Sequence, residues 1–156
     1  MTLPTLAWIA VAAYAVHMME EFSFNWRDWA RAVIKLPVEW GDFYVTNAVV
    51  IVLGIAQAFL APTLAVAPLG FASLMAINAI FFHILPVLVT KGRFSPGLFT
   101  AVVLFLPVAW VVWARAIEDG QVDAKTATIA ILGAALLMAY PIVMLHLRSR
   151  PYFRQT

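Results

Sequence analysis

The stretch Tyr14-Ala-Val-His17-Met-Met-Glu20-Glu21-Phe-Ser-Phe24 decides how the rest of the chain is interpreted. It closes an apolar run, Leu3 to Met19, that is otherwise free of charge. Charged side chains at bilayer depth are rare, usually face the interior of a helical bundle and mark functional sites. Positions i, i+3 and i+4 share one face of a helix. His17, Glu20 and Glu21 are therefore predicted to point into one small volume.

The composition indicates an integral membrane protein. Hydrophobic residues make up 64% and charged residues 12% of the 156 residues, whereas soluble domains are about half apolar and a quarter charged. The absence of cysteine excludes disulfides, thiolate nucleophiles and Cys-ligated metals. The net charge is +2, and because the basic residues border apolar segments, we expect them to meet lipid headgroups and not nucleic acid.

Five segments approach the roughly 20 apolar residues that a membrane-spanning helix needs. They run from about Leu3 to Phe22, Phe43 to Leu60, Leu69 to Val89, Ser95-Pro96 to Ile117, and Asp123 to Leu147. Backbone polar groups in lipid must be satisfied internally, so each segment is predicted to be a helix. Ser95 and Pro96 are predicted as the N-cap and first residue of the fourth helix. Pro86, Pro107 and Pro141 are predicted to kink their helices.

An amphipathic pattern separates the first two spans. Its apolar stripe is Phe22, Trp26, Trp29, Val33 and Leu36, its polar face is Arg27, Asp28, Arg31 and Lys35, and Pro37 ends it. This pattern is typical of a short helix lying in the headgroup plane. We interpret it either as a lid over the His-Glu motif or as a plain interfacial anchor. The predicted fold is thus an all-α integral membrane protein with one domain, residues 1–156. It contains a bundle of about five transmembrane helices plus one interfacial amphipathic helix.

The distribution of basic residues predicts the orientation. Eight of the ten lie on one side of the predicted bundle: Arg27, Arg31, Lys35, Lys91, Arg93, Arg148, Arg150 and Arg154. Only Arg115 and Lys125 lie on the other side. The positive-inside rule then places the N-terminus outside and the C-terminus in the cytoplasm, with the chain in an inner or plasma membrane.

Polar groups from all five predicted helices gather in the same half of the membrane. They are His17, Glu20, Glu21, Asn47, His83, Thr100, Tyr140 and His146. Tyr14, Asn47, Thr100 and Tyr140 are our candidates for substrate contacts. Asn78 precedes His83 by five residues, about 140° around an α-helix, so we predict that Asn78 serves helix packing and does not share the pocket. His146, beside the basic tail, is predicted to be an interfacial residue.

The residues of this half suit metal chemistry. His17, Glu20, Glu21 and His83 supply two imidazoles and two carboxylates, a set typical of zinc, iron or manganese. Carboxylate-bridged dimetal bundles use Glu-x-x-His pairs, and here a single pair occurs in the reverse order. We therefore predict one divalent metal ion. The resulting hypothesis is a membrane-embedded enzyme that acts on a lipophilic small molecule.

The same residues also permit metal-free acid-base catalysis. A Glu held at low dielectric can act as a general acid near neutral pH. Two adjacent carboxylates with a His could share one proton and protonate an alkene or epoxide, or move a double bond. Aromatic side chains could line the lipophilic pocket and stabilise developing positive charge, or simply pack in the core or against lipid. These aromatic residues are Tyr14, Phe24, Phe81 and Phe82.

Several other functions stay open from the residues alone. The Glu side chains could pair with Arg27 or Arg31 in an ion-paired cap, and His83 could bond a neighbouring carbonyl. Two histidines at similar depth could ligate haem. The chain could also be a proton or metal-ion carrier, or an accessory subunit without catalysis. Homo-oligomers are open as well. Against a carrier, no chain of ionisable groups crosses to the other side.

His17-Met-Met-Glu20-Glu21 at the end of the first span resembles the signature of the HXXEE family of small bacterial and archaeal integral membrane proteins. The chain length and predicted helices fit that family. The resemblance implies that His17, Glu20 and Glu21 are signature residues. It also implies a later histidine in the bundle, for which His83 is our candidate. The resemblance supports a site and implies no particular reaction.

Overall fold

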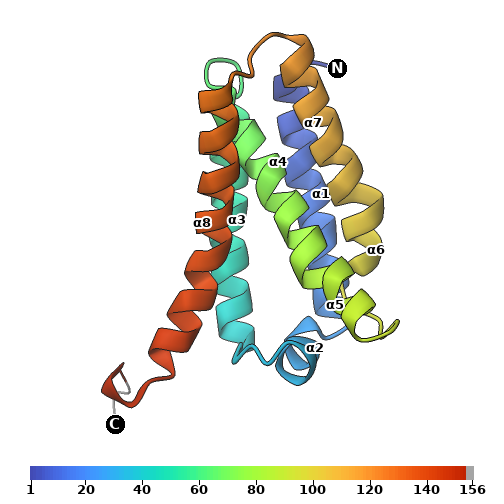
Figure 1. The fold of residues 1–156 in the computed structure, drawn as a ribbon, viewed down its shortest axis with the longest axis vertical. Coiled ribbons are helices and arrows are strands. Elements are labelled where there is room, and N and C mark those ends of the chain that lie inside the picture. The colour runs from blue at the N-terminus through green and yellow to red at the C-terminus, as the bar shows by residue number, and fades with distance from the viewer. Residues whose placement is uncertain (154–156) are drawn as a thin grey trace.

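The computed structural model describes residues 1–153, so Arg154 of the predicted basic tail lies outside the described residues. Five helical spans are long and apolar enough to cross a membrane. They are α1 (Leu3–Ser23), α3 (Trp40–Leu60), α4–η1–α5 (Val66–Asn78, Ala79–Ile84 and Leu85–Val89), α6–η2–α7 (Leu98–Thr100, Ala101–Phe105 and Leu106–Glu118) and α8 (Ala124–Arg148). The spans alternate in direction (Figure 1). The predicted all-α membrane bundle is therefore confirmed.

Small side chains bring the helices close together in the core. At the N-terminal end of α1, one cluster comprises Leu3, Leu6, Leu69, Ala72, Ala109, Val112, Ala116 and Ala130. A second cluster nearer the His-Glu motif comprises Ala10, Ala13, Tyr14, Phe71, Met75, Ala79, Ala101 and Phe105. Association of membrane helices depends on close packing, since lipid is as apolar as the side chains themselves, and alanines allow that approach. The second cluster packs directly against the motif, since its Phe105 ring lies 4.1 Å from the His17 ring between centroids.

Two spans contain a π-helical segment next to a proline. Segment η1 ends just before α5, in which Pro86 is the second residue, and η2 ends just before α7, in which Pro107 is the second residue. Proline lacks an N–H group and its ring clashes with the carbonyl four residues earlier. The wider turn of a π-helix relieves that clash, and such turns are frequent at functional sites. The helix α8 contains Pro141 and bends along its length (Figure 1).

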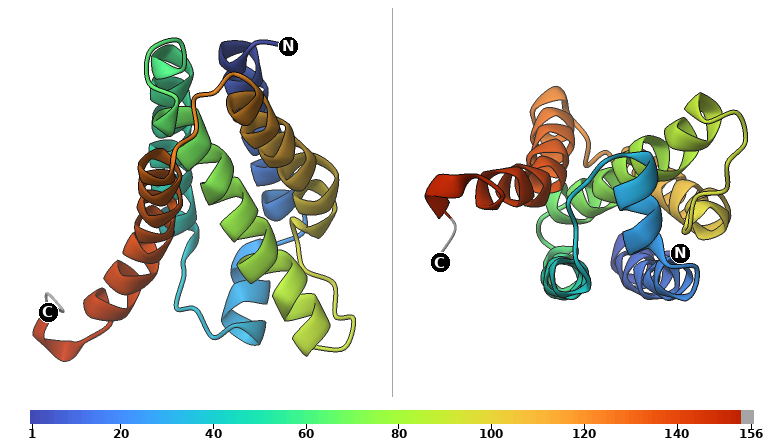
Figure 2. Two further views of the ribbon diagram at one scale, coloured as in Figure 1. Left: turned by 45° about the horizontal axis from the view of Figure 1, so that its top comes forward. Right: turned by 90° about the horizontal axis from the view of Figure 1, so that it is seen from below.

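The interfacial helix is shorter than the predicted stripe. Helix α2 spans Trp26–Val33 and lies across the end of the bundle (Figure 2). Phe22 belongs to α1 and Leu36 follows α2, because Asn25 and Lys35 have left-handed backbones with φ of 58° and 59° that interrupt the helix at both ends. The buried side of α2 packs with the segment before α3, in a cluster that side chains of α8 also contact. This cluster is formed by Trp29, Ala30, Leu36 and Val38, with Ile142 and Leu145 against it.

The start of the fourth span also differs from the prediction. Helix α6 begins at Leu98, after Gly97 with φ of 93°, so Ser95 is not its N-cap. The Ser95 hydroxyl instead donates to the Phe82 carbonyl oxygen at 3.3 Å and lies 3.2 Å from His83 Nδ1. The prediction was wrong because the Ser95 hydroxyl bonds to the third span and does not cap α6. The turn at Gly97 precedes the helix instead.

Candidate functional site

Three buried side chains converge at the end of α1. His17 and Glu21 lie one turn apart on α1, and His83 reaches them from η1. Both histidines are fully buried and Glu21 is 5% exposed. One ligand atom from each of the three residues lies within 4.8 Å of the other two. Two imidazoles and a carboxylate thus share one water-poor volume.

The Glu21 carboxylate lies close to both histidines without a hydrogen bond to either. Glu21 Oε1 lies 3.6 Å from His17 Nε2 and 3.5 Å from His83 Nε2, which is long for a hydrogen bond. Two ligands at about 2.1 Å from a tetrahedral zinc ion are separated by about 3.4 Å. His17 Nε2 is buried and has no hydrogen-bond partner, and leaving such a group unpaired costs about 1–3 kcal/mol. An ion between these atoms would satisfy the unpartnered His17 Nε2.

The Thr100 hydroxyl determines which ring nitrogen of His17 carries the proton and which carries the lone pair. Thr100 Oγ1 donates to Glu20 Oε2 at 2.6 Å and lies 2.8 Å from His17 Nδ1. The hydroxyl has one proton and an ionised carboxylate only accepts. His17 Nδ1–H therefore donates to Thr100 Oγ1, and in the neutral imidazole the lone pair is on Nε2, which faces Glu21. Partners of this kind orient metal-binding histidines in proteins.

Glu20 points away from the cluster, toward the start of α6. Its carboxylate accepts from the backbone N–H of Phe99 at 3.2 Å and from that of Thr100 at 2.7 Å, as well as from the Thr100 hydroxyl. The three residues of the cluster are His17, Glu21 and His83, without Glu20. The two adjacent carboxylates of the motif therefore have different surroundings: Glu21 faces two imidazoles and Glu20 holds the fourth span against α1.

Asn78 lies beside His83, contrary to the prediction. Asn78 Oδ1 is 3.1 Å from His83 Nε2. The predicted separation of 140° assumed an α-helix, whereas η1 is a π-helix in which residues five apart are bonded neighbours. On the other side of the ring, His83 Nδ1 lies beside the Ser95 hydroxyl described above. Both histidines thus have a hydroxyl group at Nδ1.

Gly97 closes the cluster from the side. A Cβ atom at this position would lie 2.5 Å from His83 Cε1, 2.8 Å from His17 Cε1 and 3.0 Å from Glu21 Cγ. Glycine is therefore needed here both for its left-handed backbone and for the close approach of the chain to all three side chains. The sequence motif Ser95-Pro96-Gly97 signals a turn, but nothing in it indicates which side chains the turn approaches.

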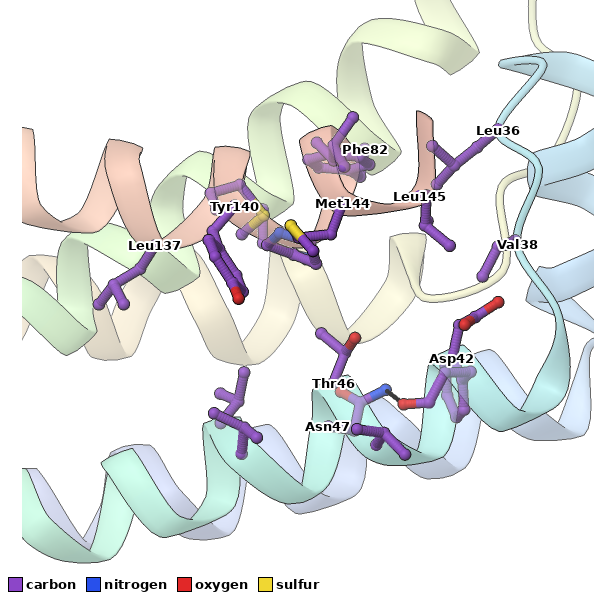
Figure 3. A pocket seen from close by; sticks show the side chains of 18 of the residues that line it. Leu36, Val38, Asp42, Thr46, Asn47, Phe82, Leu137, Tyr140, Met144 and Leu145 are labelled. Carbon is purple, nitrogen blue, oxygen red and sulfur yellow. Dashed lines mark hydrogen bonds between the residues drawn. The ribbon is translucent and has the colours of Figure 1, made fainter. Parts of the chain in front are cut away.

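An apolar cavity of about 930 Å³ adjoins the cluster at Glu21. Figure 3 shows it between α3 and α8, with Thr46 and Tyr140 facing each other across it. Three of the four candidate substrate contacts line this cavity, namely Tyr14, Asn47 and Tyr140. Thr100 is not among the lining residues and instead lies behind His17. Inside the cavity wall, the Tyr14 hydroxyl donates to Asn47 Oδ1 at 3.2 Å.

Other candidate residues lie elsewhere. Of the four aromatic candidates, Tyr14 and Phe82 line the cavity, whereas Phe24 and Phe81 are exposed. Arg27 and Arg31 both pair with Glu39 and not with Glu20 or Glu21, so the expected pairing of these arginines with the motif carboxylates was wrong. The separate location of α2 after Asn25 explains this, because it turns the arginines toward the start of α3. His146 is exposed and its Nδ1 lies 2.8 Å from the Ile142 carbonyl oxygen.

Comparison with known proteins identifies a family but no characterised relative. No curated protein and no solved structure matches the chain. The model of one family, described as proteins of unknown function with an HXXEE motif, matches residues 8–112. This range covers about two thirds of the chain and includes His17, Glu21 and His83, and it ends before α8. The chain is therefore a member of the HXXEE family.

Proposed function

We propose that this protein is a membrane-embedded enzyme that acts on a lipophilic small molecule at one divalent metal ion held by His17, Glu21 and His83. The observation that carries this proposal is the unpartnered Nε2 of His17, which faces the Glu21 carboxylate and the second imidazole in a fully buried volume. Nitrogen and oxygen ligands of this kind suit zinc, iron or manganese.

Three protein ligands are typical of a catalytic metal site, because one coordination position stays open for substrate. A metal ion there would polarise an oxygen of the substrate as a Lewis acid. The role of the surrounding residues would be to position the two histidines. Thr100 and Glu20 hold His17 in the ligand tautomer, and the Ser95 hydroxyl lies 3.2 Å from His83 Nδ1. The cavity beside Glu21 would admit the lipophilic molecule and keep water out.

Acid-base catalysis by Glu21 is the alternative that the same geometry favours. Glu21 faces both imidazoles, whereas the Glu20 carboxylate already accepts from two backbone N–H groups and one hydroxyl. In this variant of the proposal Glu21 exchanges the proton with substrate and the histidines tune or relay it. Both mechanisms act on the same molecule in the same cavity.

Two observations favour an enzyme over a carrier or a haem protein. A carrier needs ionisable groups across the bilayer, but the buried polar residues described in the opposite half are Gln57 and Ser73, which bond to backbone carbonyls. A haem ligated by both histidines needs space between their rings. These rings meet edge to face with centroids 4.8 Å apart, and Gly97 lies against both.

The proposed site lies at the end of the bundle that carries most of the basic residues. Helix α2, the turn after α5 and the end of α8 all lie at this end (Figure 1). The positive-inside rule makes it cytoplasmic. We therefore propose a site in the cytoplasmic half of an inner or plasma membrane, with the N-terminus outside.

Metal analysis of the detergent-purified protein tests the proposal. We expect one bound divalent ion per chain, lost in His17→Ala, Glu21→Gln and His83→Ala. His146→Ala is the matched control, because this histidine is exposed and bonded only within α8, and it should keep the ion. A wild-type protein without metal, or equal metal content in all variants, would reject the metal centre.

Activity on a lipophilic substrate separates the two mechanisms. With a metal, a strong chelator abolishes turnover. With acid-base catalysis, chelator has no effect, whereas Glu21→Gln removes turnover because Gln keeps the shape of Glu but cannot ionise. Full activity in both His17→Ala and Glu21→Gln would overturn either mechanism.

A further inference from the structure

The charged side chains around the cavity are paired with one another. Apart from Glu21, the charged residues that line it are Glu39, Asp42 and Arg148. Arg148 donates to both carboxylate oxygens of Asp42, at 2.5 and 2.9 Å. Glu39 accepts from Arg27 and Arg31. Within the described residues, the cavity wall thus has no free cation to meet an anionic headgroup.

Uncharged polar groups, in contrast, are present at the inner wall. Asn47 is 6% exposed, accepts from the Tyr14 hydroxyl and donates to the Phe43 carbonyl oxygen at 2.9 Å. Asn78 and Thr46 also line the cavity. Groups of this type recognise hydroxyl or carbonyl oxygens through hydrogen bonds and fix the orientation of a bound molecule.

We propose that this cavity binds a long-chain lipid with an uncharged, oxygen-bearing head, and that it holds the head near Asn47 and Tyr14, beside Glu21. The remaining wall is apolar and includes Leu36, Val38, Leu53, Leu137 and Leu145. The volume of about 930 Å³ lies at the upper end of the range of about 300–1,000 Å³ for small-molecule sites, so it accommodates a chain as well as a head. This inference rests on the proposed function only for the identity of the reacting centre. Binding of the lipid in the cavity does not depend on it.

Photolabelling of the whole protein in nanodiscs tests this substrate class. The probe is a long-chain primary alcohol that carries a diazirine, and the matched probe is the carboxylic acid of the same length. We expect the alcohol to label residues of the cavity wall on α3 and α8 more strongly than the acid does. Excess unlabelled alcohol should compete and excess acid should not. Equal or stronger labelling by the acid would overturn the inference.

Variants on one helix locate the binding. Thr46→Trp should fill the cavity and abolish labelling, whereas Val52→Trp, at a position on α3 that is 64% exposed and not among the lining residues, should leave it unchanged. Asn47→Leu should reduce alcohol labelling roughly threefold to tenfold, the value of one hydrogen bond. Circular dichroism and gel filtration check that each variant folds. Labelling that ignores Thr46→Trp would place the lipid elsewhere and overturn the inference.

Metal content separates this inference from the proposed function. A protein that binds the alcohol in the cavity but holds no metal, and that keeps its activity in Glu21→Gln, overturns the proposed function alone. A protein that holds the metal but prefers the acid overturns the lipid class and leaves the metal centre in place.

Discussion

His83 Nε2 lies 3.1 Å from Asn78 Oδ1, although five residues separate the two in the chain. In an α-helix these side chains would diverge, and it is the π-helical segment Ala79–Ile84 that aligns them. The segment stands next to Pro86, so one proline explains the local geometry of the site. Because an amide oxygen only accepts, His83 Nε2–H is the donor in this hydrogen bond. An ion bound to His83 Nε2 would replace that proton, and Asn78 Oδ1 would then lie within reach of the ion as a further ligand.

We predict that Asn78→Leu weakens metal affinity about 10- to 100-fold, the loss typical when a residue that supports a metal site is removed. Leu keeps the approximate volume but removes the amide. Asn47→Leu is the matched control, because Asn47 is also an amide that lines the cavity but bonds to Tyr14 and Phe43 and not to a histidine. Titration of the apo protein with zinc measures both affinities. Equal affinity in wild type and Asn78→Leu would leave Asn78 as a packing residue.

Thr100 provides a second test, of the His17 tautomer. We predict that Thr100→Val weakens metal affinity about 10- to 100-fold, because it removes the acceptor for His17 Nδ1–H. Thr100→Ser retains the hydroxyl and should restore affinity to near the wild-type value. Nitrogen chemical shifts of His17 report the tautomer directly, and in Thr100→Val they should indicate a mixture. An unchanged tautomer in Thr100→Val would contradict this role.

The attachment of α2 is predicted to depend on pH through Glu39. A side-chain hydrogen bond from Arg27, together with the charges of Arg27 and Arg31, lowers the pKa of Glu39 below its usual value of 4.5. A carboxylate with a lowered pKa stabilises the folded arrangement above its unfolded pKa, and this contribution is lost as the pH falls through the folded pKa. We therefore expect α2 to loosen below about pH 4.5, the reference value.

A fluorophore on Ala32→Cys measures this loosening, since the chain contains no other cysteine. Its anisotropy should fall as the pH decreases below 4.5, the reference pKa of Glu39. In Glu39→Gln the anisotropy should be low already at neutral pH, without this step. Glu118→Gln, at the other end of the bundle, should behave as wild type. A pH step that persists in Glu39→Gln would assign the effect to Asp28 or Asp42, the neighbouring carboxylates.

Most of the fold could be predicted because it depends on properties that single segments display. The apolar length of each span and the requirement that its backbone bonds internally give five helices without any knowledge of contacts. The same local information located His17 and Glu21 one turn apart on α1. Local patterns also suggested α2, but not its bounds, because Asn25 and Lys35 adopt left-handed backbones that no periodicity indicates.

The inner arrangement of the site could not be predicted, because it depends on contacts between spans. Glu20 and Glu21 are adjacent in sequence, yet Glu20 bonds to Thr100 from the fourth span and Glu21 faces His83 from the third. The contact of Ser95 with Phe82 on the third span escaped prediction for the same reason, whereas Asn78 lies beside His83 on its own span because of the π turn. A helical wheel describes one α-helix at constant pitch, and it fails where a proline induces a π turn.

The proposed orientation in the membrane rests on the bias of basic residues, eight against two. We predict that a tag placed after Thr156 is protected from external protease in intact cells and becomes accessible on lysis. Cleavage of the tag from outside the cell would invert the orientation and move the proposed site to the outer half of the membrane.

Gly97 offers a test in which backbone strain and contact with the site can be separated. Gly97 and Gly92 have similar left-handed backbones, with φ of 93° and 98°, so alanine at either position is strained by roughly 1–2 kcal/mol. Only at Gly97 would the added Cβ collide with His83 and His17, at 2.5 and 2.8 Å, whereas nothing lies within 4 Å of a Cβ at Gly92. We therefore expect both variants to lose similar stability from strain, and Gly97→Ala alone to lose metal binding and turnover. Melting temperature and zinc affinity measured on the same samples distinguish the two effects. If Gly92→Ala lost metal as fully as Gly97→Ala, backbone strain would explain the loss, and the close approach of Gly97 to His17, Glu21 and His83 would have no role in it.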